Sequence, residues 1–408
     1  MHRSGPVGGR RLVLVCLGAA AAVAAAAVIA FAPRGTEAVP PPTPTTAAGP
    51  TVAARRSGPS NVYVLGAGPA RLYKADLEAG RIRRFLKLEH DAMEMAFTPD
   101  GRTMIAMGVD GTRLIDARTG AVRGTVPLLS TPTTMQLSPD GGTMYLLGLV
   151  GPGRLRLIAV NVADGNAAAP VDVGASANAI ALSPDGRTLY VVDPGQVSMT
   201  QDGTIDYGPG RLTAIDTATG RAGRPMVLPG YVQRLVFTPD GRTAYVITGD
   251  AVTPIDTATM AAGPAVEVPG DPLDIVADAR TVYVLCEHAT IEDGEMVVAP
   301  IDVATAKLRA PITVTGVGHG AYRITLAPGA GRAYVYGGGS TIGRIDTTDD
   351  TAGPPVKLSG APHQIDFSRD GATAYVLTEE SLQPVDTASG APGKAVKLPR
   401  GAVGIAAG

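Results

Sequence analysis

Charged residues recur along a set of short apolar segments, and their types and spacing could support ligand binding. Counted back from a recurring turn proline, the fourth and second positions are nearly all apolar, whereas the sixth, fifth and third are often polar. This alternation predicts strands with one apolar and one polar face. The charged members of the polar set form the candidate site: Glu94, Arg234, Asp271, Asp274, Arg323, His363 and Asp366.

The alternative interpretation of these seven residues is a solvated wall whose opposite charges neutralise one another. No catalytic pattern accompanies them: His-Glu-x-x-His, paired-Cys metal spacing and Gly-x-Ser-x-Gly do not occur. Cys286 ends an apolar segment and is predicted to be a core residue rather than a nucleophile. The sequence therefore predicts no catalytic residue, no metal site and no cofactor.

The candidate residues are carried by a unit that repeats every 40–45 residues from residue 61 onward. Its clearest copy reads Ser183-Pro184-Asp185-Gly186-Arg187-Thr188-Leu189-Tyr190-Val191, followed by Ile215-Asp216-Thr217-Ala218-Thr219-Gly220. Pro presets a turn's φ, Asp binds neighbouring amides and Gly accepts a positive φ, so each unit should contain four short strands joined by tight turns. Because Asp216 has counterparts in almost every unit, a role in turns is favoured over a catalytic ring of aspartates.

These combined motifs resemble the YVTN-type (YncE-like) repeats, a family related to the WD-repeat propellers. The resemblance covers residues 61–408 and implies an all-β β-propeller. The tyrosine and aspartate strands each occur eight times, which predicts eight four-stranded blades, with seven as the alternative. The last strand, Val403 to Ala407, should close the first blade by pairing with residues 61–65.

In such a fold, the uniform Pro-Asp-Gly and Thr-x-Thr-Gly turns share one face. The variable loops share the other face, and the insertions Asp193–Gly210 and Glu287–Val298 belong to it. Variation over a uniform scaffold is typical of binding. We therefore expect a monomeric binding or interaction scaffold whose partner, a protein or a small molecule, contacts the loop face and the central channel.

Two other functions follow from the resemblance. Some similar propellers are lactonases that use His, Glu and Arg around the channel, which Glu94, Arg234, Arg323 and His363 could imitate. The family also includes a periplasmic DNA-binding member. Beyond residue 60, however, 29 basic and 36 acidic residues give a net charge of −7, and the chain contains no Trp, so nucleic-acid binding is not favoured.

The first 60 residues differ in composition from the rest of the 408-residue chain. Residues 1–11 form a short basic segment with Arg at 3, 10 and 11, and residues 12–32 are uncharged and long enough to span a bilayer as a helix. Residues 33–60 are rich in Pro, Ala and Thr and should form a disordered linker. The pattern predicts a single-pass signal anchor with the propeller outside the cytoplasm; a cleaved signal peptide and a secreted protein are the alternative.

Overall fold

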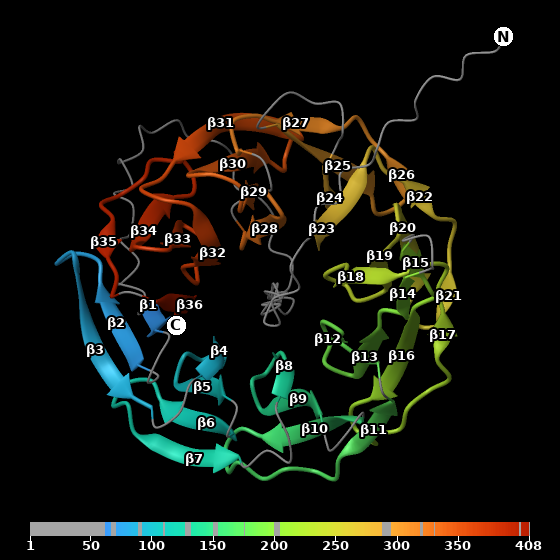
Figure 1. The fold of residues 1–408 in the computed structure, drawn as a ribbon, viewed down its shortest axis with the longest axis horizontal. Helices are drawn as coiled ribbons and strands as arrows, with labels where there is room; N and C mark the ends of the chain where they lie inside the picture. The colour runs from blue at the N-terminus through green and yellow to red at the C-terminus, as the bar shows by residue number, and fades with distance from the viewer. Residues whose placement is uncertain are drawn as a thin grey trace, which may run out of the picture.

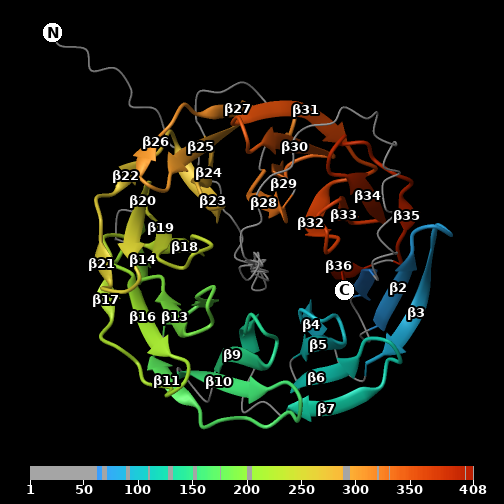
Figure 2. The same ribbon diagram turned by 180° about the vertical axis from the view of Figure 1, so that it is seen from behind.

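The computed structural model describes residues 62–407, except for short gaps at 67–70, 89–91, 109–110, 127–131, 150–153, 175, 200–204, 288–294, 319–320, 330 and 400. The expected basic segment, membrane anchor and linker lie outside the described residues. Within the described part, no helix has the length and apolar character needed to cross a membrane. The described chain forms an eight-bladed β-propeller, as the repeats predict (Figures 1 and 2).

Each blade is an antiparallel sheet whose strands follow one another in order from the axis to the outside. The inner strands of blades 1 to 8 are β36 (Ala402–Ala407), β4 (Ala92–Phe97), β8 (Pro132–Leu137), β12 (Ala179–Leu182), β18 (Val232–Phe237), β23 (Asp271–Ala277), β28 (Arg323–Ala327) and β32 (Pro362–Phe367). The second strands are β1 (Val62–Gly66), β5 (Thr103–Gly108), β9 (Thr143–Leu149), β13 (Thr188–Asp193), β19 (Thr243–Thr248), β24 (Thr281–Glu287), β29 (Arg332–Tyr336) and β33 (Thr373–Thr378).

The third strands are β2 (Arg71–Asp76), β6 (Gly111–Asp116), β10 (Leu155–Asn161), β16 (Arg211–Asp216), β20 (Ala251–Asp256), β25 (Met296–Asp302), β30 (Thr341–Asp346) and β34 (Ser381–Asp386). The outer strands are β3 (Arg81–Lys87), β7 (Val122–Val126), β11 (Val171–Gly174), β17 (Met226–Val227), β21 (Ala261–Ala262) with β22 (Val266–Glu267), β26 (Lys307–Leu308) with β27 (Ile312–Val314), β31 (Thr351–Lys357) and β35 (Val396–Lys397).

The C-terminal strand closes the ring, as predicted. In blade 1, β36 pairs antiparallel with β1, and Val64 stands opposite Ile405 (Figure 1). Both side chains are buried, so closure satisfies two sheet edges and covers apolar surface at the same time.

The repeated turns are built as their residues predict. In the Pro-Asp-Gly turn of blade 4, Ser183 donates its hydroxyl hydrogen to Asp185 over 2.6 Å, and Gly186 takes a φ of +72°. In the next turn, Asp216 accepts hydrogen bonds from the amide and hydroxyl of Thr219, which lower the pKa of its carboxyl. The turn role of these aspartates is confirmed.

Apolar residues pack between blades. Eight apolar clusters among the described residues each combine side chains from two neighbouring blades. The repeated tyrosines belong to these clusters, and their side chains are almost completely buried. Their hydroxyls reach the next blade: Tyr63 donates to the carbonyl of Ala117 over 2.6 Å, and Tyr190 to that of Thr257 over 3.4 Å.

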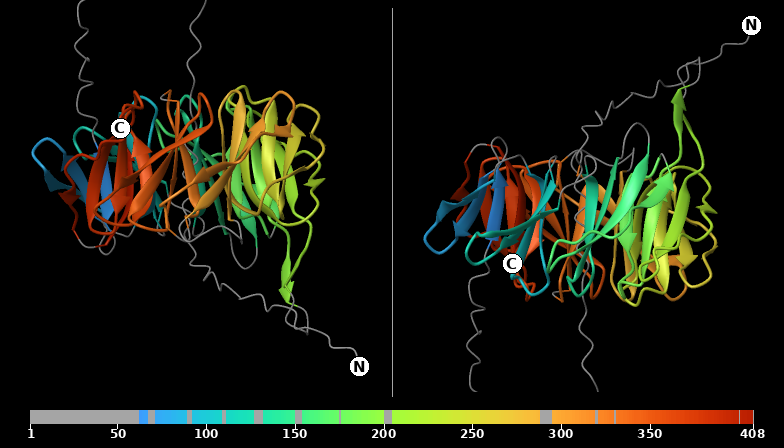
Figure 3. Two further views of the ribbon diagram at one scale, coloured as in Figure 1. Left: turned by 90° about the horizontal axis from the view of Figure 1, so that it is seen from above. Right: turned by 90° about the horizontal axis from the view of Figure 1, so that it is seen from below.

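A hairpin extends from blade 4 on the loop face. Its strands β14 (Val197–Met199) and β15 (Ile205–Tyr207) lie within the insertion between β13 and β16. Figure 3 shows it projecting beyond the body of the propeller, on the face opposite the end of β36. The insertion in blade 6 falls partly on residues 288–294, outside the described residues.

Candidate functional site: the axial mouth

Two layers of side chains surround the axis on the loop face. In each blade, the strand register pairs one inner-strand residue with the second-strand residue that lies two positions after the repeated tyrosine. We call this layer the second ring: Glu94, Thr134, Ala179, Arg234, Asp274, Arg323, Gln364 and Gly404. The residue before each forms the rim ring: Met93, Thr133, Asn178, Gln233, Leu273, Tyr322, His363 and Val403. Together the two rings form the axial mouth.

Backbone bulges shape the rim. In six inner strands the register shifts at the rim residue, so that residue has no partner in the second strand. A bulge re-aims its side chain, and bulges gather at rims and binding sites. Several rim residues are exposed, including His363, Tyr322 at 45% and Val403 at 52%. The rim thus presents amide, imidazole, phenol and aliphatic groups at one mouth.

The register corrects the predicted alignment of blade 6. Counting back from the turn predicts Asp271 at the rim, six residues away, and Asp274 in the layer below the second ring, three residues away. In the structure Asp274 belongs to the second ring, and Asp271 lies beyond the rim, opposite Glu287. The cause is a shorter turn: blade 6 replaces the Pro-Asp-Gly sequence by a turn in which the Asp278 amide donates directly to the Thr281 carbonyl. Leu273 therefore takes the rim position.

Polar side chains of the second ring reach the inner strand of the following blade. The Glu94 carboxyl accepts a hydrogen bond from the Met135 amide, and burial raises the pKa of Glu94 to about 7. The Gln364 amide makes two hydrogen bonds of 3.0 Å with the backbone of Ile405. These side chains satisfy edge groups of inner strands that no neighbouring strand pairs.

Three consecutive blades contribute the Arg–Asp–Arg cluster, which consists of Arg234, Asp274 and Arg323. The Arg234 Nε lies 3.4 Å from an Asp274 carboxylate oxygen, and the two side chains are 30% and 10% exposed. Asp274 also accepts the Ile324 amide over 3.1 Å. Burial raises the pKa of the Asp274 carboxyl, while the guanidinium groups of Arg323 and Arg234 oppose that rise.

The remaining predicted residues do not join this cluster. Asp366 lies one layer deeper, where its carboxylate accepts the Ala407 amide over 2.7 Å and the Phe367 amide over 2.8 Å. Burial raises the pKa of this carboxyl, and its contacts hold the closing strand β36. His363 is exposed on the rim of blade 8, and Asp271 is exposed outside both rings.

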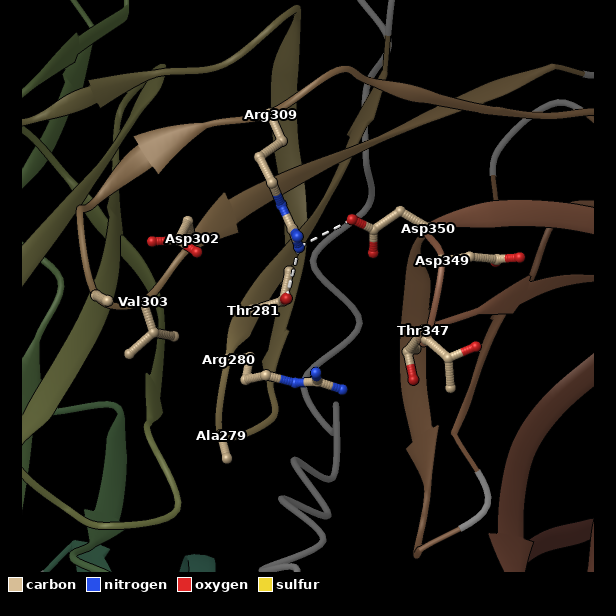
Figure 4. Close-up of a pocket in the computed structure, with 11 residues that line it drawn as sticks. Ala279, Arg280, Thr281, Asp302, Val303, Arg309, Thr347, Asp349 and Asp350 are labelled. Carbon is tan, nitrogen blue, oxygen red and sulfur yellow. Dashed lines mark hydrogen bonds and ion pairs between the residues drawn. The ribbon is translucent and has the colours of Figure 1, made fainter.

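Sequence reasoning missed a hollow on the turn face between blades 6 and 7. It has a volume of about 460 Å³ (Figure 4). Arg309 pairs there with Asp350 over 2.9 Å and donates to the Thr281 hydroxyl, while the Tyr283 hydroxyl donates to Asp350 over 2.8 Å. One signal was visible in the sequence, because Asp350 occupies the repeat position that Gly220 occupies in blade 4. In the structure, the φ of Asp350 is +58°.

These contacts indicate an inter-blade clamp rather than a ligand site. Asp350 is fully engaged by Arg309 and Tyr283, and the other two carboxylates of the hollow, Asp302 and Asp349, accept hydrogen bonds from their own turns. Within the described residues, no group of three His, Cys, Asp or Glu side chains is arranged to hold a metal ion.

Comparison with known proteins shows the fold. No protein-family model and no curated protein sequence matches this chain. Dihydro-heme d1 dehydrogenase NirN in complex with DHE is similar over 87% of this chain and 77% of its own, at 17% identity and a TM-score of 0.65. Hydrazine synthase of Kuenenia stuttgartiensis aligns over 77% and 98% at 18% identity, with a TM-score of 0.53. Apo AztD from Citrobacter koseri aligns over 85% and 97% at 13% identity, with a TM-score of 0.55. At these identities the likeness establishes the β-propeller architecture alone.

Proposed function

We propose that this chain is a membrane-anchored, extracytoplasmic binding scaffold that takes its ligand or partner at the axial mouth and the adjoining loop face. The contrast between the two faces carries this proposal. On the turn face, the aspartates and threonines are occupied by hydrogen bonds that hold turns and junctions. On the loop face, bulges present chemically different side chains above a charged cluster.

The proposed family is the YVTN-type repeat propellers. The support is the paired motif of blade 4, Ser183 to Val191 with Ile215 to Gly220, together with eight blades of matching strand order. The proposed location rests on the uncharged run 12–32 behind three arginines. Fractionation of the full-length protein and of a variant lacking residues 12–32 tests the anchor: the full chain should remain in the membrane after a carbonate wash, and the variant should not.

Ligand binding at the mouth is tested by thermal shift of the full chain in detergent micelles against small acids, amines and sugars. A ligand present at 100 times its Kd should stabilise the fold by about 2.7 kcal/mol. Gln233→Ala, on the rim of blade 5, should remove that shift. Arg242→Ala, an exposed residue on the turn face of the same blade, should retain it. A compound whose shift depends on Arg242 and not on Gln233 would contradict the proposed face.

A lactonase-like hydrolase is the second candidate, and Glu94 is the observation that favours it. A carboxyl whose pKa is about 7 is poised to exchange a proton at neutral pH, which suits a general acid or base. The test is turnover of a panel of lactones by the wild type and two variants. Catalysis is supported if Glu94→Gln abolishes turnover and Glu379→Gln, which replaces an exposed carboxylate of blade 8, leaves it intact. The absence of turnover across the panel would exclude lactones as substrates.

A further inference from the structure

We propose that the Arg–Asp–Arg cluster binds the carboxylate of an aromatic organic acid whose ring lies against Tyr322 on the rim. This inference rests on the proposed function and specifies the ligand class of the same mouth. It follows from the hydrogen-bonding capacity of the cluster, its charge and the side chains directly above it.

The cluster has more hydrogen-bond donors than acceptors. Two guanidinium groups carry ten N–H bonds, whereas the Asp274 carboxylate already accepts the backbone amides of Ile324 and Ile275. The Arg234 Nε already faces the Asp274 carboxylate at 3.4 Å, and its Nη1 donates to the Gln233 carbonyl over 3.3 Å. A carboxylate that also accepts two backbone amides cannot accept the remaining N–H bonds of two guanidinium groups, so an oxyanion would supply further acceptors.

The charge of the cluster also favours an anion. Two arginines and one aspartate leave one excess positive charge, in a propeller whose net charge is −7. The nearest further acid of the second ring, Glu94, lies on β4, on the opposite side of the axis from β23 (Figure 1). Guanidinium groups bind carboxylates through two parallel hydrogen bonds, so this site should prefer a planar carboxylate to a point anion.

The rim above the cluster supplies a surface for an aromatic body. The Arg323 guanidinium lies 6.0 Å from the centre of the Tyr322 ring, which is 45% exposed. That ring rests against Gly337, where an added Cβ would come within 2.7 Å of it. Leu273, half-buried, takes the neighbouring rim position on blade 6. A ring stacked on Tyr322 would place its carboxylate one layer down, at Arg323.

Calorimetric titration of the full chain in detergent micelles tests the proposal with four probes: phenylacetate, acetate, inorganic phosphate and 2-phenylethanol. We expect phenylacetate to bind at least tenfold more tightly than any of the others. Arg234→Gln and Arg323→Gln should each weaken phenylacetate tenfold or more, whereas Arg242→Gln, on the turn face of blade 5, should not change its affinity. Asp274→Asn should strengthen binding several-fold, because it removes the competing carboxylate and keeps an acceptor for the Ile324 amide.

Two further variants separate the parts of the site. Tyr322→Ala should weaken phenylacetate and leave acetate unchanged. Arg323→Lys keeps the charge and loses the bidentate fork, so it should still weaken phenylacetate if Arg323→Gln fails to fold. Phosphate binding as tightly as phenylacetate would overturn the preference for an aromatic carboxylate. If no anion binds while the thermal-shift screen yields a neutral or cationic ligand dependent on Gln233, this inference fails and the proposed function stands.

Discussion

The hydroxyl of the repeated tyrosine links neighbouring blades through a single hydrogen bond. Tyr63 and Tyr190 occupy equivalent positions, but their distances to the acceptor carbonyls are 2.6 Å and 3.4 Å. Tyr63→Phe should therefore lower the free energy of unfolding by about 1–2 kcal/mol, since the buried Ala117 carbonyl loses its partner. Tyr190→Phe, the matched control, should cost less. Urea unfolding measures both, and equal losses would show that hydroxyl distance does not set the contribution.

Glu94 should make the stability of the fold depend on pH. Burial raises the pKa of its carboxyl from 4.5 to about 7, so the folded state binds a proton that the unfolded state has already released. An acid of this kind reduces the free energy of unfolding as the pH rises through that window, by roughly 3 kcal/mol in total. Glu94→Gln should lose less stability between pH 4.5 and pH 7 than the wild type does. Thermal midpoints at several pH values measure this, and parallel curves for the two proteins would contradict it.

Glu379→Gln is the control for that comparison. It removes one exposed carboxylate from the loop between β33 and β34, in blade 8 rather than in the blade of Glu94. Its midpoint should follow the wild-type curve.

At the scale of the turns, three units depart from glycine at the left-handed position. Met260, Ala306 and Asp350 all have φ values between 51° and 58°. Ala306→Gly should raise the free energy of unfolding by about 1 kcal/mol, because it relieves an unfavourable backbone conformation. Asp350→Gly relieves the same conformation but removes the contacts to Arg309 and Tyr283, so it should not stabilise. A gain for Asp350→Gly equal to that for Ala306→Gly would mean that the clamp contributes nothing.

At the scale of the whole molecule, closure depends on one strand. Removal of residues 402–408 exposes the edge of β1 and the buried side chain of Val64, each apolar side chain of this size contributing roughly 1.5–3 kcal/mol. We expect a fall in thermal midpoint and association through the open edge, detected by size-exclusion chromatography. Removal of Gly408 alone is the control. A truncated protein that elutes at the same oligomeric state as the full chain, with an unchanged midpoint, would contradict this role for β36.

The architecture was predictable because each blade repeats its turn chemistry, so strand order, blade number and closure could be read from recurring residues such as Tyr190 and Asp216. The site was less predictable. Asp274 was placed in the wrong layer because blade 6 lacks the proline from which positions were counted. The bulges at the rim residues leave no sequence signal, and the partners of Asp366 are backbone amides, whose positions depend on the whole ring.

Because Val64 and Ile405 come from opposite ends of the propeller sequence, blade 1 is the first to be synthesised and the last to be completed. At about 5–20 residues per second, its inner edge must wait tens of seconds for its partner strand. During synthesis the unfinished ring therefore presents an open sheet edge to other nascent copies and to proteases. A chain that ends anywhere before β36 leaves the edge of β1 unpaired permanently. Resistance of the propeller to association and proteolysis therefore depends on synthesis of its last strand.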